Sequence, residues 1–455
     1  MPKKKKLLIF LGAGSSIDQG FPSTRDVDQE VADWASQYVK EKKADPIDSI
    51  DARTRTNFYA LLWKNRLDYS AEQNSAQRPM FEHRTFPNYE RVLGDLHILM
   101  NGVLAKPFGD PMHKWVTRAD VFSGLNIAPE AGDLDQQGSG KIFHAVENQL
   151  KNLNERLAKT LRVKSHQFEN SLSNAIGAAR FKPYRDLMAT LAREFEIGVY
   201  NLNYDTVALS ALPNSFVGFD RPSGQFLAAE VLGRSAWGFL YHLHGSVHHT
   251  MKYGSHVMEH DDFGPKIVWN DDISNHQNGK IWQDSAELTT QSEEKRMLLT
   301  TLIAGGWKLD QLQEEPFLSL YSCISRHVYD ADALLIGGYG FGDSHINSIL
   351  RNALRSRANN KRRPPILVID YDEDRRPTAK RSGSWPMAMG KTLRVPPHSF
   401  RCHRSDRNAL FESELKAEFE LSSHAPIAIW NGGFAAAAQN ATRMTKWLIG
   451  DHNAL

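Results

Sequence analysis

Short apolar runs recur along this chain, and several are followed directly by glycines or by polar side chains. Five of the runs have the length and composition of buried strands. They cover residues 6–11, 197–200, 239–241, 333–336 and 366–369. Continuous apolar runs are typical of parallel strands that are covered by helices on both faces. The pattern therefore predicts an open α/β sheet.

The chain between the first two runs has a different periodicity. From about residue 51 to residue 194, apolar positions recur at helical spacing, as in residues 89–99 and 146–161. We expect residues 1–50 and 195–375 to form the sheet domain and residues 51–194 to form a large helical insertion. We expect this insertion to cover a ligand-binding site of the sheet domain and to shape the entrance to it.

Residues 376–455 depart from the pattern of the sheet domain. Residues 375–400 are basic and rich in proline, glycine and serine, which is typical of a loop or linker. Helical spacing follows at residues 408–419 and 433–448. We expect a C-terminal helical extension, which either contacts another subunit or partner or packs on its own domain.

Polar side chains with catalytic potential follow two of the predicted strands. Asn203 and Asp205 come just after residues 197–200, and His244 follows residues 239–241. Ligands of open α/β sheets bind beyond the carboxyl ends of the strands, so these amide, carboxylate and imidazole groups should converge on one crevice. Each also has a structural interpretation, because histidines often pack in cores and Asn and Asp often close turns. Their shared position at strand ends favours a reaction site.

Glycines follow two further predicted strands. The first strand opens into Gly12–Ser16 and Gly20–Arg25, and the fourth opens into Gly337–Asn347, which leads into a helix. Small residues let backbone amides approach a phosphate, and a following helix adds its positive end. The dehydrogenase fingerprint needs glycine where Ile17 stands, and the first loop lacks the Gly-Lys-Ser/Thr ending of a P-loop. Neither an ordinary dehydrogenase nor a P-loop NTPase is supported.

An acidic residue ends the fifth predicted strand. Asp370 follows residues 366–369 directly. An acid at this position commonly binds ribose hydroxyls, and its charge favours free hydroxyls over a 2′-phosphate.

In their order along the chain, these motifs resemble the sirtuin-like nucleotide-binding domain of bacterial antiviral NAD hydrolases. The matching motifs are Gly12-Ala13-Gly14, Gly20-Phe21-Pro22 with Arg25, Asn203-Tyr204-Asp205, His244-Gly245-Ser246 and Gly338-Tyr339-Gly340-Phe341-Gly342-Asp343. The resemblance implies a Rossmann-like parallel sheet with NAD as substrate. It also implies that His244 is the catalytic imidazole and that Asn203 and Asp205 lie near nicotinamide and its ribose. The residues expected to bind NAD are Gly12, Ala13, Gly14, Ser15, Pro22, Arg25, Gly338, Tyr339, Gly340, Asp343 and Asp370.

Two positions differ from the sirtuin deacylases that the chain also resembles. Thr24 stands where those enzymes usually carry a phenylalanine that shields the cleaved bond. Gly340 stands where a serine or threonine is usual, which leaves backbone amides to contact the phosphate.

The number of cysteines separates the activities of this family. Deacylases are built around a zinc held by four thiolates, whereas this chain has only Cys323 and Cys402, in no C-x-x-C pair. Two cysteines also suit a reducing cytosol, and the short apolar run after Lys3–Lys6 does not resemble a signal peptide. A metal site could be imagined from the histidines near residue 244, but their spacing matches no known motif, so no metal is expected. The alternative metal ligands are His242, His244, His248, His249, His256, His260, Asp261 and Asp262.

The function that these observations favour is hydrolysis of NAD to nicotinamide and ADP-ribose. His244 would act as general base toward water, and Asn203 and Asp205 would hold nicotinamide and the water. Three alternatives stay open at this point: an NAD-dependent protein deacylase, a non-catalytic NAD or ADP-ribose sensor, and an ADP-ribosyltransferase. Release of acetate from a peptide would indicate the deacylase, and tight binding without turnover would indicate the sensor. Label transferred from NAD to protein would indicate the transferase.

Composition sets limits on partners and location. The chain has 455 residues, is 41% hydrophobic and carries a net charge of +2, so it can bury a large core but lacks the charge of a strong nucleic-acid binder. No apolar run reaches membrane-spanning length, so we expect no transmembrane helix. Together with the cysteine usage, this leads us to expect a cytoplasmic protein. The family resemblance implies a homo-oligomer in antiviral defence, with a partner such as a HerA-type ATPase or a short Argonaute.

Overall fold

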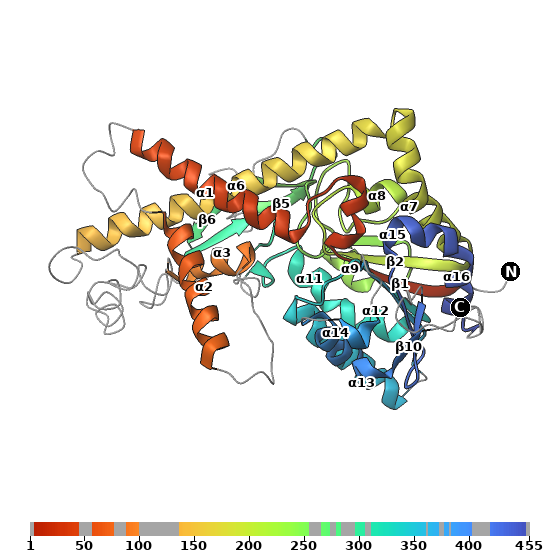
Figure 1. Cartoon of the computed structure of the whole chain (residues 1–455). Helices are drawn as coiled ribbons and strands as arrows, with labels where there is room; N and C mark the ends of the chain where they lie inside the picture. The colour runs from red at the N-terminus through yellow and green to blue at the C-terminus, as the bar shows by residue number, and fades with distance from the viewer. Residues whose placement is uncertain are drawn as a thin grey trace.

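An eight-stranded sheet forms the centre of the molecule (Figure 1). The computed structural model describes residues 4–44, 57–76, 88–99, 136–253, 265–273, 279–283, 296–304, 311–360, 363–372, 377–381, 384–402 and 419–451. The strands of the sheet are β1 (Lys5–Leu11), β2 (Phe195–Asn201), β3 (Phe239–His242), β8 (Ala333–Gly337), β9 (Ile366–Ile369), β10 (Phe400–Cys402), β11 (Phe419–Ser422) and β12 (Ile427–Trp430).

The order of the strands is β10-β11-β12-β9-β8-β1-β2-β3. Neighbours from β12 to β3 are parallel, whereas β11 runs antiparallel to both of its neighbours. The chain moves from β1 to β2 and β3 on one side and then returns to place β8 on the other side of β1. This reversal makes the carboxyl ends of β1 and β8 the topological switch point, where open α/β sheets bind ligands. The predicted α/β, Rossmann-like architecture is confirmed.

Helices cover both faces of the sheet, which explains why its central strands are apolar throughout. Leu7, Ile9 and Leu11 belong to a core with α7 (Ala175–Glu194) and α16 (Ala441–Ile449). Leu8 and Phe10 point to the opposite face and pack in a second core. That core includes side chains from α12 (Ile324–Asp330), α13 (Ser344–Asn360) and α14 (Trp385–Leu393).

Four helices form a separate arm beyond the sheet (Figure 1). They are α1 (Thr24–Ala44), α2 (Phe58–Ala76), α3 (Tyr89–Ile98) and α6 (Gln136–Ser171). Their apolar faces share one core with Val247, Leu302 and Tyr204, which belong to loops after the strands. The helical part predicted for residues 51–194 thus meets the sheet domain at its carboxyl edge. The last helix of that range, α7, instead packs on the sheet.

The C-terminal region completes the sheet. The sequence predicts a helical extension for residues 376–455, and the structure shows helices there in α14, α15 (Gly433–Ala437) and α16. It also places β10, β11 and β12 of this region in the main sheet, which the pattern analysis does not predict. β10 and β11 contain the polar residues Arg401 and Glu420, so they form no continuous apolar run. Residues 408–418 lie outside the described residues.

The remaining elements are short. Two small hairpins pair β4 (His249–Tyr253) with β5 (Pro265–Trp269) and β6 (Gly279–Gln283) with β7 (Arg296–Thr300). The short helices are η1 (Ala13–Ser15), η2 (Ile17–Gln19), α8 (Val207–Ala211), α9 (Ala228–Gly233), α11 (Phe317–Ser322), η6 (Thr378–Lys380), η7 (Pro397–Ser399) and η9 (Ala438–Asn440). Within the described ranges, no helix combines the length and the apolar character needed to cross a membrane.

Candidate functional site

The two glycine loops contact each other at the switch point of the sheet. The amide of Gly12 donates to the carbonyl of Gly337 at 2.9 Å, and the amide of Gly14 donates to the carbonyl of Gly338 at 2.9 Å. A Cβ atom on Gly12 would lie 2.6 Å from the Gly338 carbonyl oxygen. Gly338 has a φ of +61°, and a Cβ atom there would lie 2.1 Å from the Ser15 nitrogen. These glycines are therefore required for the two backbones to meet.

Two other glycines in the second loop, Gly340 and Gly342, are not required by contacts with other parts of the protein that the structure describes. Gly340 and Gly342 are exposed, their φ angles are not positive, and a Cβ atom on either would meet no atom within 4 Å among the described residues. Between them, Phe341 adopts a φ of 52°, in the left-handed region that non-glycine residues rarely occupy. Such strain is concentrated at functional sites. The open space over Gly340 and Gly342 fits a ligand that the backbone approaches closely.

Side chains behind the second loop hold it in shape. The Tyr339 hydroxyl donates to Oδ1 of Asn347 at 2.9 Å, and Nδ2 of Asn347 donates to the carbonyl of Phe341 at 2.7 Å. The Phe341 ring is buried against Tyr339, with ring centroids 4.9 Å apart. The backbone of this loop is therefore fixed before any ligand arrives.

Asn203 joins the loop after β2 to the first glycine loop. Its Nδ2 lies 3.0 Å from the Gly12 carbonyl oxygen, 3.0 Å from Oγ of Ser15 and 3.1 Å from Oγ of Ser16. Because a carbonyl only accepts, the contact with Gly12 identifies this atom as the amide nitrogen. Oδ1 of Asn203 accepts no hydrogen bond within the described part of the chain, so it can bind a water or a substrate group.

Asp205 is a buried carboxylate two residues further along. Its Oδ1 accepts a hydrogen bond from the amide of Val207 at 3.0 Å, and the side chain is almost fully buried. Burial raises the pKa of Asp205 to about 6, although hydrogen bonds from Ser16 and Val207 oppose the rise. A carboxyl group with this pKa changes charge close to neutral pH, which is unusual for aspartate and typical of functional sites.

His244 lies in the loop after β3 and faces the second glycine loop. Its Nε2 is 3.0 Å from Oδ2 of Asp343, and the residue is 6% exposed. The carboxylate lies off the line of the ring N–H bond, so the contact is an electrostatic pair rather than a straight hydrogen bond. A proton on Nε2 leaves Nδ1 as the basic nitrogen, and Nδ1 has no partner among the described residues.

His242 is the neighbouring imidazole, and its surroundings are structural. Its Nδ1 lies 3.1 Å from the carbonyl oxygen of Asn203. Burial lowers the pKa of His242 to about 3, with a small opposing effect from the Asn203 carbonyl. It stays neutral at working pH and supports the backbone of Asn203. Of these two histidines, His244 is the one with a carboxylate partner.

The helical arm packs beside this site through Tyr204. The hydroxyl of Tyr204 donates to the carbonyl of Ile303 at 2.7 Å, and Tyr204 packs against the core of the arm. Burial raises the pKa of Tyr339, and the negative charges of Asp343 and of Glu90 in α3 add to the rise. Glu90 of α3 thus lies near enough to Tyr339 for its charge to act on the tyrosine.

Asp370 ends β9 next to the second glycine loop, where the amide of Gly338 donates to the carbonyl of Ile369 at 2.8 Å. Nη1 of Arg381 donates to Oδ2 of Asp370 at 2.5 Å. Burial raises the pKa of Asp370, whereas the hydrogen bond and charge of Arg381 oppose that rise. Arg381 also donates to Asn431 at 2.5 Å and lies 3.5 Å from Asp372.

The remaining predicted residues lie around the first glycine loop. Ala13 is exposed at its rim, Ser15 is buried and donates to the Gly12 carbonyl at 2.8 Å, and Pro22 is half-buried. Arg25 is exposed as the second residue of α1, and no contact connects its side chain to the glycine loops. The structure brings the other predicted groups together at one edge of the sheet but does not place Arg25 with them.

A metal centre finds no support in the described ranges, where no group of three His, Cys, Asp or Glu side chains is arranged to hold an ion. His256, His260, Asp261 and Asp262, which entered the alternative metal site, lie outside the described residues.

Two features of the site were not predicted from the sequence. Asp343 was assigned to the phosphate loop, yet its Oδ2 faces His244 while its Oδ1 accepts from the amides of His345 and Ile346 at the start of α13. Arg381, the partner of Asp370, lies in a basic segment that the sequence presents as a linker. No local signal identifies either pair, because both form across the fold.

Comparison with known protein families gives one match. Residues 198–387 match the family model described as the SIR2-like domain. The match runs from β2 into α14 and contains Asn203, Asp205, His244 and the second glycine loop. It supports a sirtuin-like family, whose members use NAD. No curated protein matches the chain.

Proposed function

On the premise that residues 198–387 form a SIR2-like domain, we propose that this protein hydrolyses NAD to nicotinamide and ADP-ribose. The observation that carries the proposal is the assembly of three groups at one switch point. His244 contacts Asp343 of the second glycine loop, and Asn203 contacts the first glycine loop. Residues that follow four strands, β1, β2, β3 and β8, therefore lie together at the switch point.

The two glycine loops suit the pyrophosphate of NAD. Their backbones are in contact, and the positions of Gly340 and Gly342 leave open space above the second loop. The helix α13 begins directly after this loop, so its positive end favours a phosphate group. Asp370 at the next strand end would accept hydrogen bonds from the adenosine ribose.

The reacting end of NAD would lie toward Asn203, Asp205 and His244. During hydrolysis the bond between the nicotinamide nitrogen and the anomeric carbon breaks, and its electron pair remains on nicotinamide, which leaves as a neutral molecule. The oxygen of water forms the new bond to the anomeric carbon, and the water gives up one proton. The transition state carries positive charge on the ribose, so a nearby carboxylate stabilises it.

Each of the three side chains has a role that its contacts support. Oδ1 of Asn203 can orient the attacking water, because its Nδ2 is already used by the first glycine loop. Asp205 supplies negative charge close to the ribose when its carboxyl group is ionised. His244 accepts the proton from water on Nδ1, directly or through a ribose hydroxyl, while Asp343 stabilises the resulting imidazolium.

Hydrolysis is favoured over protein deacylation by the cysteines of the chain. The two cysteines, Cys323 and Cys402, cannot supply the four thiolates of the zinc module that deacylases use. Cys323 is buried and contacts the carbonyl of Val231, so it serves the packing of α9.

The test is a chromatographic assay of NAD incubated with the purified full-length protein. The proposal expects nicotinamide and ADP-ribose in equal amounts and no dependence on a peptide. Acetate release from an acetylated peptide would show a deacylase instead. Label transferred to protein would show a transferase, and tight binding without turnover would show a sensor.

We also propose a biological setting. A cytoplasmic NAD hydrolase would deplete the cell unless its turnover is controlled, so a homo-oligomer or a defence partner, such as a HerA-type ATPase or a short Argonaute, would gate it in antiviral defence. The net charge of +2 gives little basis for direct binding to nucleic acid. Light scattering of an active enzyme tests this setting, and an active monomer would contradict it.

A further inference from the structure

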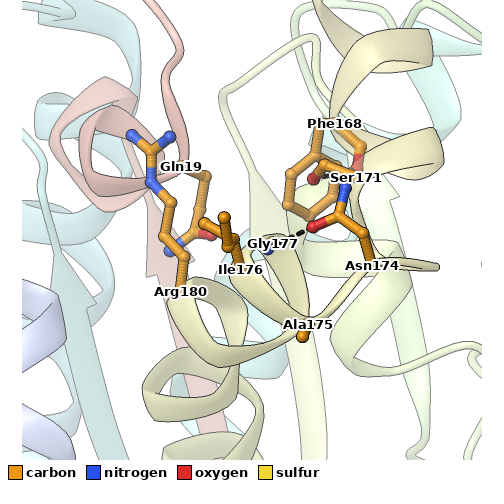
Figure 2. A pocket seen from close by; sticks show the side chains of 8 residues that line it. All are labelled: Gln19, Phe168, Ser171, Asn174, Ala175, Ile176, Gly177 and Arg180. Carbon is orange, nitrogen blue, oxygen red and sulfur yellow. Dashed lines mark hydrogen bonds between the residues drawn. The ribbon is translucent and has the colours of Figure 1, made fainter.

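A hollow lies outside the candidate site, where α6 ends, α7 begins and η2 passes beside them (Figure 2). Its volume of about 470 Å³ is in the usual range for sites that bind small molecules. It is lined by Gln19, Phe168, Ser171, Asn174, Ala175, Ile176, Gly177 and Arg180. None of these residues belongs to the NAD site proposed above.

The side-chain amide of Gln19 lines the hollow. The residue is only 7% exposed, and its side-chain amide makes no hydrogen bond within the described part of the chain. Only its backbone amide is bonded, to the carbonyl of Ser16 at 2.9 Å. A nearly buried amide without a hydrogen-bond partner among the described residues is free to bind a polar atom of a ligand in the hollow.

Arg180 brings a positive charge to the same hollow, next to Gln19 (Figure 2). Its Nε donates to the carbonyl of Asp18, which fixes the guanidinium over Gly20. Arg180 forms no ion pair with the Asp18 carboxylate in the described structure, and Oδ2 of Asp18 instead accepts from the amide of Ala435 at 3.1 Å. The two Nη groups of Arg180 contact no carboxylate in the described structure, and they can bind an anion in a forked geometry.

The first turn of α7 adds backbone donors. Oδ1 of Asn174 accepts from the amide of Gly177 at 2.8 Å and so caps the helix. The amides of Ala175 and Ile176 lie before the first hydrogen bond of the helix, and they make none elsewhere among the described residues. The positive end of a twenty-residue helix therefore meets the same hollow as Arg180.

The hollow also has an apolar side. The ring of Phe168 lies on one wall, and Ile176 is 84% exposed beside it (Figure 2). An exposed isoleucine in the first turn of a helix contributes nothing to the core, but it can cover a flat apolar group.

From these contacts we infer that the hollow binds a small organic phosphate, about the size of a mononucleotide, with the phosphate on Arg180 and the α7 amides and a flat apolar group between Phe168 and Ile176. Gln19 would bind a polar atom of the same ligand. The eight lining residues, all within the described part of the chain, include one cation and no carboxylate, which matches an anion.

We expect that binding at this hollow changes the affinity of the NAD site for its ligand. The amide of Gln19 donates to the carbonyl of Ser16 at 2.9 Å, and Ser15 and Ser16 of the first glycine loop contact Asn203. A ligand that engages Gln19 and Arg180 would fix the end of this loop and change the affinity for NAD. Only this coupling rests on the function proposed above, whereas the binding itself does not.

The experiment is a calorimetric titration of the full-length protein with phenyl phosphate, AMP and inorganic phosphate. We expect saturable binding of phenyl phosphate and AMP, and weaker binding of inorganic phosphate. Arg180→Ala should weaken phenyl phosphate binding by at least about tenfold. Arg185→Ala, which removes the same charge from an exposed position of α7, should change it by less than about twofold.

A second variant protects the test against misfolding. Ile176→Asp alters an exposed side chain that supports no packing, and its charge should repel the phosphate and abolish binding while the melting temperature stays unchanged. Absence of saturable binding, or equal effects of the Arg180 and Arg185 variants, would overturn the inference. Loss of AMP binding only in an Asp370 variant would show that AMP occupies the NAD site instead. A protein that binds phenyl phosphate but never releases nicotinamide would refute the proposed function and leave this site standing.

Discussion

His244 and Asp343 are 3.0 Å apart, although their loops follow β3 and β8, which are separated in the sheet by β2 and β1. The pair therefore reaches over the carboxyl ends of β1 and β2. Beneath it, Asn203 contacts the first glycine loop. The contact brings the imidazole and the second glycine loop together at the switch point.

The first prediction concerns the carboxylate of this pair. Asp343→Asn keeps the cap on α13, because Oδ1 still accepts from the amides of His345 and Ile346, but it removes the charge beside His244. Turnover of NAD should fall by about 10- to 10³-fold, since an imidazolium loses its stabilising partner. Steady-state kinetics should show the loss in kcat more than in KM. An unchanged kcat would mean that Asp343 serves only the loop.

The second prediction concerns Asp205 and pH. Burial raises its pKa from 3.8 to about 6, so the folded protein favours the protonated form. This contribution to stability is present at low pH and is lost as the pH rises through about 6. Asp205→Asn should therefore stabilise the fold at pH 7.5 by up to about 3 kcal/mol, with a smaller gain at pH 5.

The same substitution should reduce activity. Because the ionised carboxylate is the form that stabilises a cationic ribose, kcat of the unaltered enzyme should decline as the pH falls below about 6. Asp205→Asn should be slow at every pH. Thermal melts and pH–rate profiles together test both effects, and a variant that is neither more stable nor less active would refute the role of Asp205.

The third prediction compares two glycines of one loop. Gly338→Ala would place a methyl group 2.1 Å from the Ser15 nitrogen at a φ of +61°, so it should destabilise the protein by on the order of 1–3 kcal/mol or more. Gly340→Ala meets open space and should leave the melting temperature unchanged. If the phosphates of NAD lie against the second loop, however, Gly340→Ala should raise the Kd for NAD several-fold. Normal affinity in this variant would place the ligand elsewhere.

The fourth prediction concerns the choice between NAD and NADP. Asp370 and Asp372 lie beside Arg381, and the added negative charge of a 2′-phosphate should be repelled by these carboxylates. Asp370→Asn should raise the ratio of kcat/KM for NADP to that for NAD by about tenfold, an effect of roughly 1.4 kcal/mol. Asp330→Asn, an exposed change at the end of α12, is the control. An unchanged ratio would remove Asp370 from the ribose site.

Much of the fold could be predicted because apolar runs are a local signal. The run at residues 6–11 corresponds to β1, and those at residues 333–336 and 366–369 correspond to β8 and β9. β12 is not predicted although Ile427–Trp430 is apolar. The expectation for residues 376–455 depends on the composition of residues 375–400 and on the helical spacing at residues 408–419 and 433–448, which lie on either side of it. In this region the short apolar run at Ile427–Trp430 indicates the secondary structure better than the composition of the surrounding residues.

The site was less accessible to sequence reasoning. Strand ends indicated where His244 and Asn203 would lie, because the edge of a parallel sheet follows from chain direction. The sequence does not predict which side chains these residues contact. Asp343 pairs with His244, and Arg381 pairs with Asp370, through contacts between distant segments that no spacing encodes.

The central claim is that the imidazole of His244 acts on NAD held by the two glycine loops. Its most direct test measures both NAD binding and nicotinamide release for His244→Ala, with His398→Ala, an exposed histidine far along the chain, as the matched control. The account predicts that His244→Ala binds NAD within about threefold of the unaltered protein but releases nicotinamide about 10²–10⁴ times more slowly, while His398→Ala is normal in both. Release at the unaltered rate by His244→Ala would contradict it.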